Sequence, residues 1–172
     1  MESPEANMEG LSSGLGEVDW VAVYQASRYA FPSQDGWRVF ALDGEAGPFD
    51  DLNRSVTLIT AWNPDSEDRS REWNDEANAR LAAELVAAAE DFEDSWGASL
   101  PDIEPAWKEH GFAVYGWTRE EARDWGLRFG QRAVVYLDGE SADLIFCEPG
   151  WAVVCGLRRF PNEPCEALGD PS

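Results

Sequence analysis

Short apolar runs alternate with turn residues along most of the chain, and this pattern predicts a domain built around a sheet. The expected strands cover residues 37–42, 55–61, 111–117, 133–137, 142–147 and 151–157. Strands and helices do not alternate regularly enough for a parallel, doubly wound fold. We therefore expect an α+β fold, with a mixed or mostly antiparallel sheet of five to six strands and one long and one or two shorter helices packed on it.

The long helix is predicted at about residues 71–91, with Ser70 as its N-cap. Its apolar face contains Ala77, Leu81, Ala82 and Leu85. Asn74 and Asn78 fall on the same apolar side, which is unusual for asparagine. A Thr118-to-Glu121 capping box predicts a shorter helix to about residue 129. A further short helix is expected within residues 19–29.

The composition of the chain ends predicts one domain between two polar tails. Residues 1–16 are rich in Gly, Ser and Glu and predict a disordered acidic tail. Residues 17–160 are expected to form a single α+β domain, and residues 161–172 a loose C-terminal tail. Residues 90–104 combine many carboxylates with glycine and proline, which predicts a solvated acidic connector.

The chain carries a formal net charge of −21, from 34 acidic and 13 Lys and Arg residues. This charge argues against direct binding to nucleic-acid phosphates and against adhesion to anionic membranes. No apolar stretch approaches the ~20 residues that cross a bilayer, and the N-terminus lacks the pattern of a signal peptide, so a cytoplasmic protein is expected. Three explanations of the charge stay open: a solvated surface, adaptation to a salty interior, or an acidic face that meets a basic partner.

The residues of metal, cofactor and nucleophile sites are scarce. Cys147, Cys155 and Cys165 have no CxxC spacing, so packed thiols are expected in place of a disulfide framework or a thiolate zinc site. The single histidine, His110, argues against a histidine metal site and a Ser-His-Asp triad. No phosphate-binding or dinucleotide-binding glycine motif occurs. We therefore expect no metal and no cofactor.

Several short motifs follow one another in the central stretch. They are Thr60-Ala61-Trp62-Asn63-Pro64, then Asn74 with Asn78 and Leu81, then Trp107 with Glu109, and finally Phe129-Gly130-Gln131. With these motifs, the region from Trp20 to Ile145 resembles an uncharacterised bacterial family, the domain of unknown function 3293. That family often has Asn and Trp where this chain has Arg132 and Tyr136. The resemblance implies a set of marked positions and no established reaction.

The polar residues of these motifs are expected to meet at one corner of the sheet. The candidate ligand-binding residues are Trp62, Asn63, Asn74, Asn78, Glu109 and Gln131. Amides and a carboxylate can read the polar edges of a base, a sugar or a peptide, and Glu109 is a candidate general base if burial raises its pKa. The alternative is that the amides only tie the fold together. Pro64 is expected to hold Asn63 in an extended backbone conformation.

Two classes of function follow from the sequence. The favoured class is a non-enzymatic acidic binding or regulatory protein that engages a protein partner with a basic surface, in the manner of a nucleic-acid mimic. The partner-binding candidates are Glu90, Asp91, Glu93 and Asp94. The alternative is a small-ligand-binding domain or a small enzyme that uses the Asn/Gln/Glu pocket. A solvent-open pocket shared by the marked residues would favour the alternative.

Overall fold

The computed structural model describes residues 18–164 of the chain. The helices are α1 (Trp20–Gln25), α2 (Arg71–Ala87) and α3 (Arg119–Arg128), with a short helical turn η1 (Pro64–Ser66). The strands are β1 (Ser27–Ser33), β2 (Gly36–Ala46), β3 (Val56–Ile59), β4 (Asp91–Ser99), β5 (Lys108–Tyr115), β6 (Ala133–Leu137), β7 (Ala142–Phe146), β8 (Ala152–Cys155) and β9 (Leu157–Glu163). The tail predicted at residues 1–16 lies outside the described residues, as does the chain from residue 165. None of the helices among the described residues is long and apolar enough to cross a membrane.

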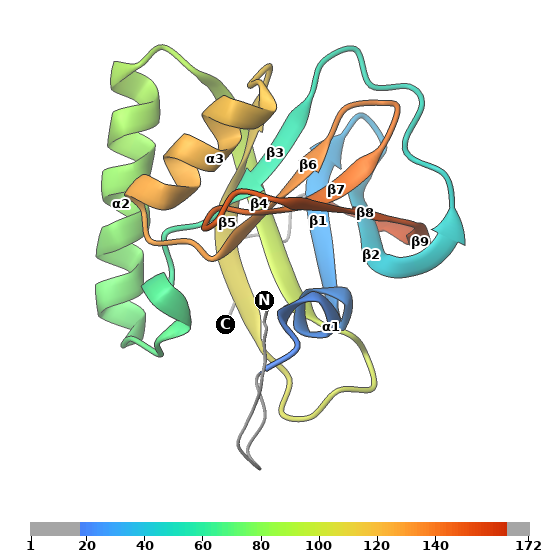
Figure 1. Ribbon diagram of the computed structural model, residues 1–172, viewed down its shortest axis with the longest axis horizontal. Coiled ribbons are helices and arrows are strands. Elements are labelled where there is room, and N and C mark those ends of the chain that lie inside the picture. Colours follow the sequence, from blue (N-terminus) through green and yellow to red (C-terminus); the bar gives the residue numbers. More distant parts are fainter. Residues whose placement is uncertain (1–17, 165–172) are drawn as a thin grey trace.

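The nine strands of the described region form one strongly curved, barrel-like sheet in the order β8-β7-β6-β3-β5-β4-β1-β2-β9 (Figure 1). Every neighbouring pair is antiparallel. The expected α+β fold with a sheet of five to six strands is therefore wrong. The molecule is dominated by its sheet, and the three helices lie against a nearly closed ring of strands.

Three strands account for the difference. β1 begins at Ser27, where a helix was expected to continue, and it forms a tight hairpin with β2 through Gln34 and Asp35. β4 occupies most of the segment that predicted an acidic connector. β9 continues to Glu163, three residues into the range predicted as a loose tail. In each case, pairing of the backbone with neighbouring strands outweighs the local composition.

Two glycines bring the edges of the sheet together. β8 pairs with β7 and β9 pairs with β2, so the two edge strands follow each other in the chain through Gly156. The Gly44 N–H of β2 donates to the Gly156 carbonyl at 3.2 Å. A Cβ atom at Gly44 would lie 2.1 Å from the Leu157 oxygen, and one at Gly156 would lie 2.1 Å from the Gly44 oxygen. Closure therefore depends on the absence of side chains at both positions.

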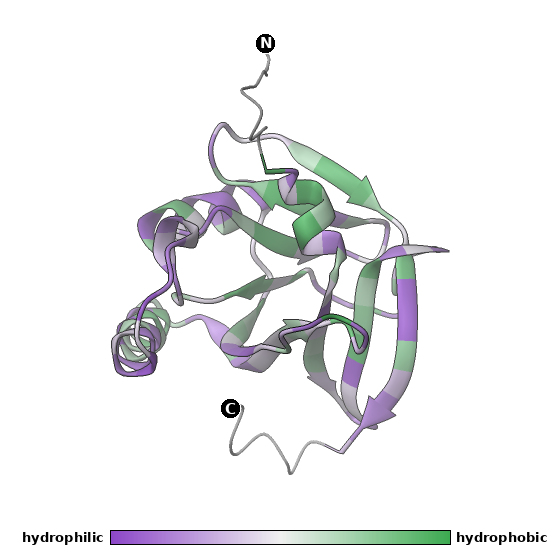
Figure 2. Ribbon diagram, turned by 90° about the horizontal axis from the view of Figure 1, so that it is seen from below, coloured by the Kyte–Doolittle hydropathy of each residue, from purple (hydrophilic) through white to green (hydrophobic). Residues whose placement is uncertain are grey.

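The concave side of the sheet holds the main core. Its fully buried side chains include Phe40, Leu42, Leu137, Leu144 and Leu157, which come from β2, β6, β7 and β9. The alternation of hydrophobic and hydrophilic residues along the strands can be followed in Figure 2. This alternation is the pattern expected of strands with one buried face.

Helices α2 and α3 cover a second core on the outer face of the sheet. Leu81 and Leu85 of α2 are fully buried there, and Phe112 and Val114 of β5 belong to the same cluster. The predicted N-cap of α2 is confirmed, because the Ser70 hydroxyl accepts from the Trp73 N–H at 3.0 Å. The predicted capping box of α3 is also confirmed.

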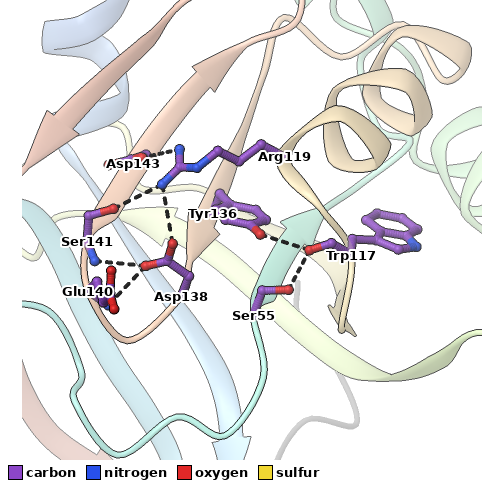
Figure 3. Close-up of polar contacts among 8 residues, drawn as sticks. All are labelled: Ser55, Trp117, Arg119, Tyr136, Asp138, Glu140, Ser141 and Asp143. Carbon is purple, nitrogen blue, oxygen red and sulfur yellow. Dashed lines mark hydrogen bonds and ion pairs between the residues drawn. The ribbon is translucent and has the colours of Figure 1, made fainter.

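A polar cluster fastens the start of α3 to the β6–β7 hairpin (Figure 3). Arg119 forms an ion pair with the buried Asp143, and its guanidinium lies 4.8 Å from the Tyr136 ring centre. The Tyr136 hydroxyl donates to the Trp117 carbonyl at 2.8 Å, and the Ser55 hydroxyl donates to the same carbonyl at 2.6 Å. These contacts hold α3 in position, and the chain that leaves α3 leads directly to Gln131.

Candidate functional site

Asn63 and Asn74 form a reciprocal pair of hydrogen bonds between the end of β3 and the start of α2. The Asn63 N–H donates to Asn74 Oδ1 at 2.9 Å, and Asn74 Nδ2 donates to Asn63 Oδ1 at 3.0 Å. The Arg69 N–H also donates to Asn63 Oδ1, at 2.9 Å. Because the amide oxygen of Asn63 accepts twice, its amide nitrogen is the group that hydrogen-bonds the Glu109 carboxyl.

The backbone at Asn63 is left-handed, with φ 47° and ψ 58°, so the expected extended conformation is wrong. Pro64 disfavours the right-handed helical region for the preceding residue, but asparagine also tolerates the left-handed region. Asp65 and Ser66 have positive φ values of 58° and 62° as well. The turn packs tightly on Gly130, whose carbonyl accepts from the Asp65 N–H at 2.7 Å. Asn63 is thus presented on a strained turn that its neighbours hold in place.

Asn78 ties α2 to the ends of two strands. Its Oδ1 accepts from the Ala61 N–H at 2.8 Å, and its Nδ2 donates to the His110 carbonyl at 2.8 Å. Asn78 is 4% exposed and Asn74 is 3% exposed. Their amide groups satisfy the protein's own backbone and the Asn63 side chain, which explains why asparagines occur on the apolar side of α2.

A cavity of about 560 Å³ lies at the end of the barrel-like sheet where β3 ends and β5 and β6 begin. Four of the six predicted ligand-binding residues line it: Trp62, Asn63, Glu109 and Gln131. The other two, Asn74 and Asn78, do not line it and support its wall from the α2 side. The aromatic part of the lining consists of Trp20, Tyr24, Tyr29, Trp62, Trp96 and Trp107.

Glu109 lies in a cross-strand row with two other cavity residues. Gly97 of β4 pairs with Glu109 of β5 on one side and with Tyr29 of β1 on the other. Side chains of directly paired residues lie on the same face of a sheet. Gly97, which has no side chain, lines the cavity together with Tyr29 and Glu109. A Cβ at Gly97 would lie 3.7 Å from Tyr29 Cδ1, so the Tyr29 ring packs directly beside this position.

Burial raises the pKa of Glu109 to about 7, because removal from water disfavours the ionised carboxylate. The hydrogen bond from Asn63 opposes this rise, and the negative charge of Asp68 adds to it. A carboxyl group with a pKa near 7 can accept or release a proton at neutral pH, as a general base must. Catalysis by Glu109 stays a prediction.

Gln131 connects the ends of β3 and α3 at the cavity wall. Its Nε2 donates to the Trp62 carbonyl at 3.1 Å and to the Phe129 carbonyl at 3.2 Å. The Trp62 indole Nε1 is buried and has no hydrogen-bond partner within residues 18–164. The Gln131 amide therefore holds the backbone of the Trp62 segment through its nitrogen.

The sequence did not mark Tyr24, Tyr29 or Arg132 as site residues, although all three line the cavity. The Tyr29 hydroxyl donates to the Tyr24 carbonyl at 2.9 Å, and burial raises the pKa of Tyr24 to about 12. The Arg132 guanidinium lies 3.9 Å from the Trp20 ring centre, and its Nε donates to Ser66 Oγ at 2.8 Å. The alternation of apolar residues at Tyr29 and Phe31 is the one local signal for strand β1. The apolar residues before Tyr29 favour a helix instead, so the sequence does not predict that Tyr29 lies on a strand.

The predicted partner-binding carboxylates lie at and before the start of β4. Asp91 pairs with Arg54 at 2.8 Å. The remaining contacts are made by Glu93, which accepts from the Tyr115 hydroxyl at 2.6 Å, and by Asp94, which lies 3.2 Å from His110 Nε2. Glu90 is half-buried just before the strand. Three of the four carboxylates thus have local partners, and their role in binding a macromolecule stays a prediction.

Cys147 and Cys155 are not among the residues that line the cavity. Cys147 is fully buried beside Gly126 of α3, and burial raises its pKa to about 11, which keeps the thiol protonated at neutral pH. Cys155 is partly buried in β8, and Cys165 lies outside the described residues.

Residues 59–134 match a family model described as "Protein of unknown function (DUF3293)". The match confirms the predicted resemblance to that family, and its range contains all six candidate ligand-binding residues. Strands β1, β2, β7, β8 and β9 lie outside the matched range. No curated protein and no solved structure matches the chain.

Proposed function

We propose that the protein is a small-molecule-binding domain whose ligand occupies the cavity at the β5 start and contacts Glu109. One observation carries the proposal: a largely buried carboxyl faces open space inside a cavity of about 560 Å³. Ligand cavities typically measure ~300–1,000 Å³ and combine apolar walls with a few polar groups. The aromatic rings supply the apolar wall, and Glu109 and Gln131 supply the polar groups.

Gly97 gives this proposal its geometric support. A sheet that needed only to be stable would gain apolar contact from a side chain at this position, because glycine in a strand interior weakens it. The neighbouring atoms stand at ordinary contact distances from a Cβ built there, and its φ is not positive. No steric or conformational demand for glycine is evident, so we interpret the space beside Glu109 as room for a ligand.

Binding is favoured over catalysis by the second ionisable group at the site. A reaction driven by Glu109 would need a partner acid, and Tyr24 is one of two cavity tyrosines, with Tyr29, whose pKa the Glu109 charge raises. With a pKa of about 12, Tyr24 keeps its proton at neutral pH, so it is poorly matched to proton transfer with Glu109. Binding of a basic macromolecule by Glu90, Asp91, Glu93 and Asp94 is a separate hypothesis, and the local pairing of three of them weakens it.

Filling the cavity tests the proposed function. In Gly97→Leu, the new side chain would project beside the Tyr29 ring into the cavity that Gly97, Tyr29 and Glu109 line. Gly47→Leu is the matched control, because a Cβ at Gly47 meets nothing within 4 Å. Ligand-observed NMR with a fragment library is expected to find fragments that bind the wild type and Gly47→Leu but not Gly97→Leu.

Thermal unfolding of each variant separates loss of binding from loss of folding. If Gly97→Leu unfolds, Gly97→Val replaces it with a smaller plug. Fragments that bind a folded plugged variant as well as the wild type would place the binding surface elsewhere and overturn the proposal, as would a library with no binders.

A further inference from the structure

We infer that the ligand of this cavity is a protonated amine with an aromatic-sized apolar body, whose ammonium group lies against the Glu109 carboxylate. The inference rests on the proposed binding function and names its ligand class. It follows from three features of the cavity: which polar atoms are still available, which charges line it, and where the aromatic rings stand relative to Glu109.

Three polar side chains close to Glu109 already donate hydrogen bonds within the protein. The Asn63 amide nitrogen is engaged with Glu109, and the Gln131 amide nitrogen donates to two carbonyls. The Thr60 hydroxyl donates to the His110 carbonyl at 2.8 Å. The ionised Glu109 carboxylate and the side-chain oxygen of Gln131 act as acceptors at this end. A ligand group that donates several hydrogen bonds fits this end, and an ammonium group donates up to three.

The charges of the lining have the sign that a cationic ligand requires. Asp68 and Glu109 both line the cavity, and Asp68 is close enough to raise the Glu109 pKa. Arg132 is the single basic residue among the lining residues of the described region. Its guanidinium is stacked on Trp20 and donates a hydrogen bond to Ser66, so its charge is engaged by residues of the cavity wall. The net charge of −21 also raises the local concentration of cations around the molecule.

The aromatic rings stand where the body of such an amine would lie. Tyr29 and Glu109 flank the empty Gly97 position in one cross-strand row, and Trp62 lines the same cavity. An ammonium group beside Glu109 would therefore have ring surface next to it, and ring faces attract cations. Binding of a cation also favours the ionised carboxylate, so affinity should rise as pH increases through the Glu109 pKa of about 7.

Three probes with a common phenylethyl group test the ligand class by isothermal titration calorimetry: 2-phenylethylamine, 2-phenylethanol and 3-phenylpropionate. They share a ring and differ in charge, which is positive, neutral and negative at about pH 8. We expect the amine to bind at least about tenfold more tightly than the alcohol, and the anion not to bind. The affinity of the amine should fall by about tenfold when the pH is lowered from about 8 to about 6, because the Glu109 carboxyl, with its pKa of about 7, becomes protonated.

Glu109→Gln is the decisive variant. It keeps an acceptor for Asn63 and removes the charge, so the amine should lose about tenfold or more in affinity while the alcohol changes far less. Glu120→Gln is the matched control, because Glu120 is an exposed carboxylate on α3 outside the cavity. The amine should bind this control as it binds the wild type.

The outcomes separate the ligand class from the binding function. Equal affinities for the three probes, all lost in Gly97→Leu, would overturn the amine and leave the cavity as a binding site. Tighter binding of 3-phenylpropionate would overturn it in favour of an anion held by Arg132. No binding of 2-phenylethylamine to the wild type would also overturn the amine class, and the fragment screen would then decide the binding function alone.

Discussion

At the scale of single residues, the surroundings of Glu109 depend on Gly97, the residue that pairs with it on β4 and has no side chain. Gly97 opens the row between Tyr29 and Glu109, so the carboxyl faces a cavity instead of bulk water. One hydrogen bond from Asn63 does not replace the lost hydration, and the pKa rises to about 7. Glu109 therefore determines both the chemistry of the cavity and a pH dependence of the protein's stability.

Glu109 should make the protein less stable as the pH increases. Its pKa of about 7 in the folded protein lies above the value of 4.5 for a solvated Glu, so the folded state holds the proton more tightly. The stabilising contribution is complete below pH 4.5, falls as the pH rises, and is lost once the pH exceeds about 7. Between about pH 5 and pH 8, we expect the free energy of unfolding of the wild type to decrease by ~2–3 kcal/mol relative to that of Glu109→Gln.

Urea unfolding between about pH 5 and pH 8 measures this difference, with both proteins studied in parallel. Glu120→Gln is the control, because it removes a carboxylate that is exposed on α3 and does not line the cavity. Identical pH profiles for the wild type and Glu109→Gln would show that Glu109 titrates normally.

Asn74 should contribute to both stability and the Glu109 pKa. Asn74→Ala removes the acceptor of the Asn63 N–H and a donor to Asn63 Oδ1. Leaving such groups unpaired costs ~1–3 kcal/mol, which urea unfolding would detect. The released Asn63 amide should also bond Glu109 less well, so the pKa of Glu109 should increase in an NMR titration. Asn53→Ala, at an exposed asparagine, should change neither quantity.

The sequence predicts the cavity residues that belong to local motifs but not those that strand pairing brings beside them. Trp62, Asn63, Glu109 and Gln131 belong to short local motifs, and the cavity contains all four. Tyr29 and Gly97 join them only through the register of β1, β4 and β5. Register depends on long-range pairing, so local residue patterns gave no signal for it.

At the scale of elements, β4 shows why the strands were undercounted. Its first half carries Asp91, Glu93 and Asp94, a composition typical of solvated loops. In the structure, these side chains remain exposed while their backbone pairs with β5, and Arg54, Tyr115 and His110 provide local partners. The helices were easier to predict, because caps and apolar spacing are local features.

Closure of the sheet should depend on Gly44 and Gly156. Alanine at either position places a Cβ 2.1 Å from a backbone oxygen, so strands must move apart. We expect each substitution to lower the free energy of unfolding by ~1–3 kcal/mol, the usual cost of overpacking, or more. Gly47→Ala, where a Cβ meets nothing within 4 Å, should stay within ~0.5 kcal/mol of the wild type. Urea unfolding that ranks all three variants alike would contradict this account of closure.

At the scale of the whole molecule, the excess of carboxylates outweighs the pairing of the arginines. Arg38, Arg54 and Arg158 each form an ion pair with a nearby Asp. The chain nevertheless has 34 acidic against 13 basic residues, so most carboxylates face a field of their own sign. Compaction brings like charges together, which destabilises the folded state and attracts cations.

Salt should therefore have opposite effects on folding and on binding. Raising NaCl from about 20 mM to about 1 M shortens the Debye length to ~3 Å. This screens both the repulsion among the carboxylates and the attraction between the protein and a cationic ligand. The free energy of unfolding in urea should increase, because repulsion among the carboxylates weakens. The affinity for 2-phenylethylamine should decrease, because attraction of the cation weakens.

A variant with less charge provides the control for this prediction. Glu76→Lys and Glu140→Lys replace two exposed carboxylates, and each adds two positive units, so the net charge changes from −21 to −17. This variant should be more stable at low salt and should gain less stability from added NaCl. A wild type that loses stability with NaCl would mean that the ion pairs of the arginines outweigh the repulsion. In that case, the attraction of cations to the cavity would come from Glu109 and Asp68 alone, and it would survive in the less charged variant.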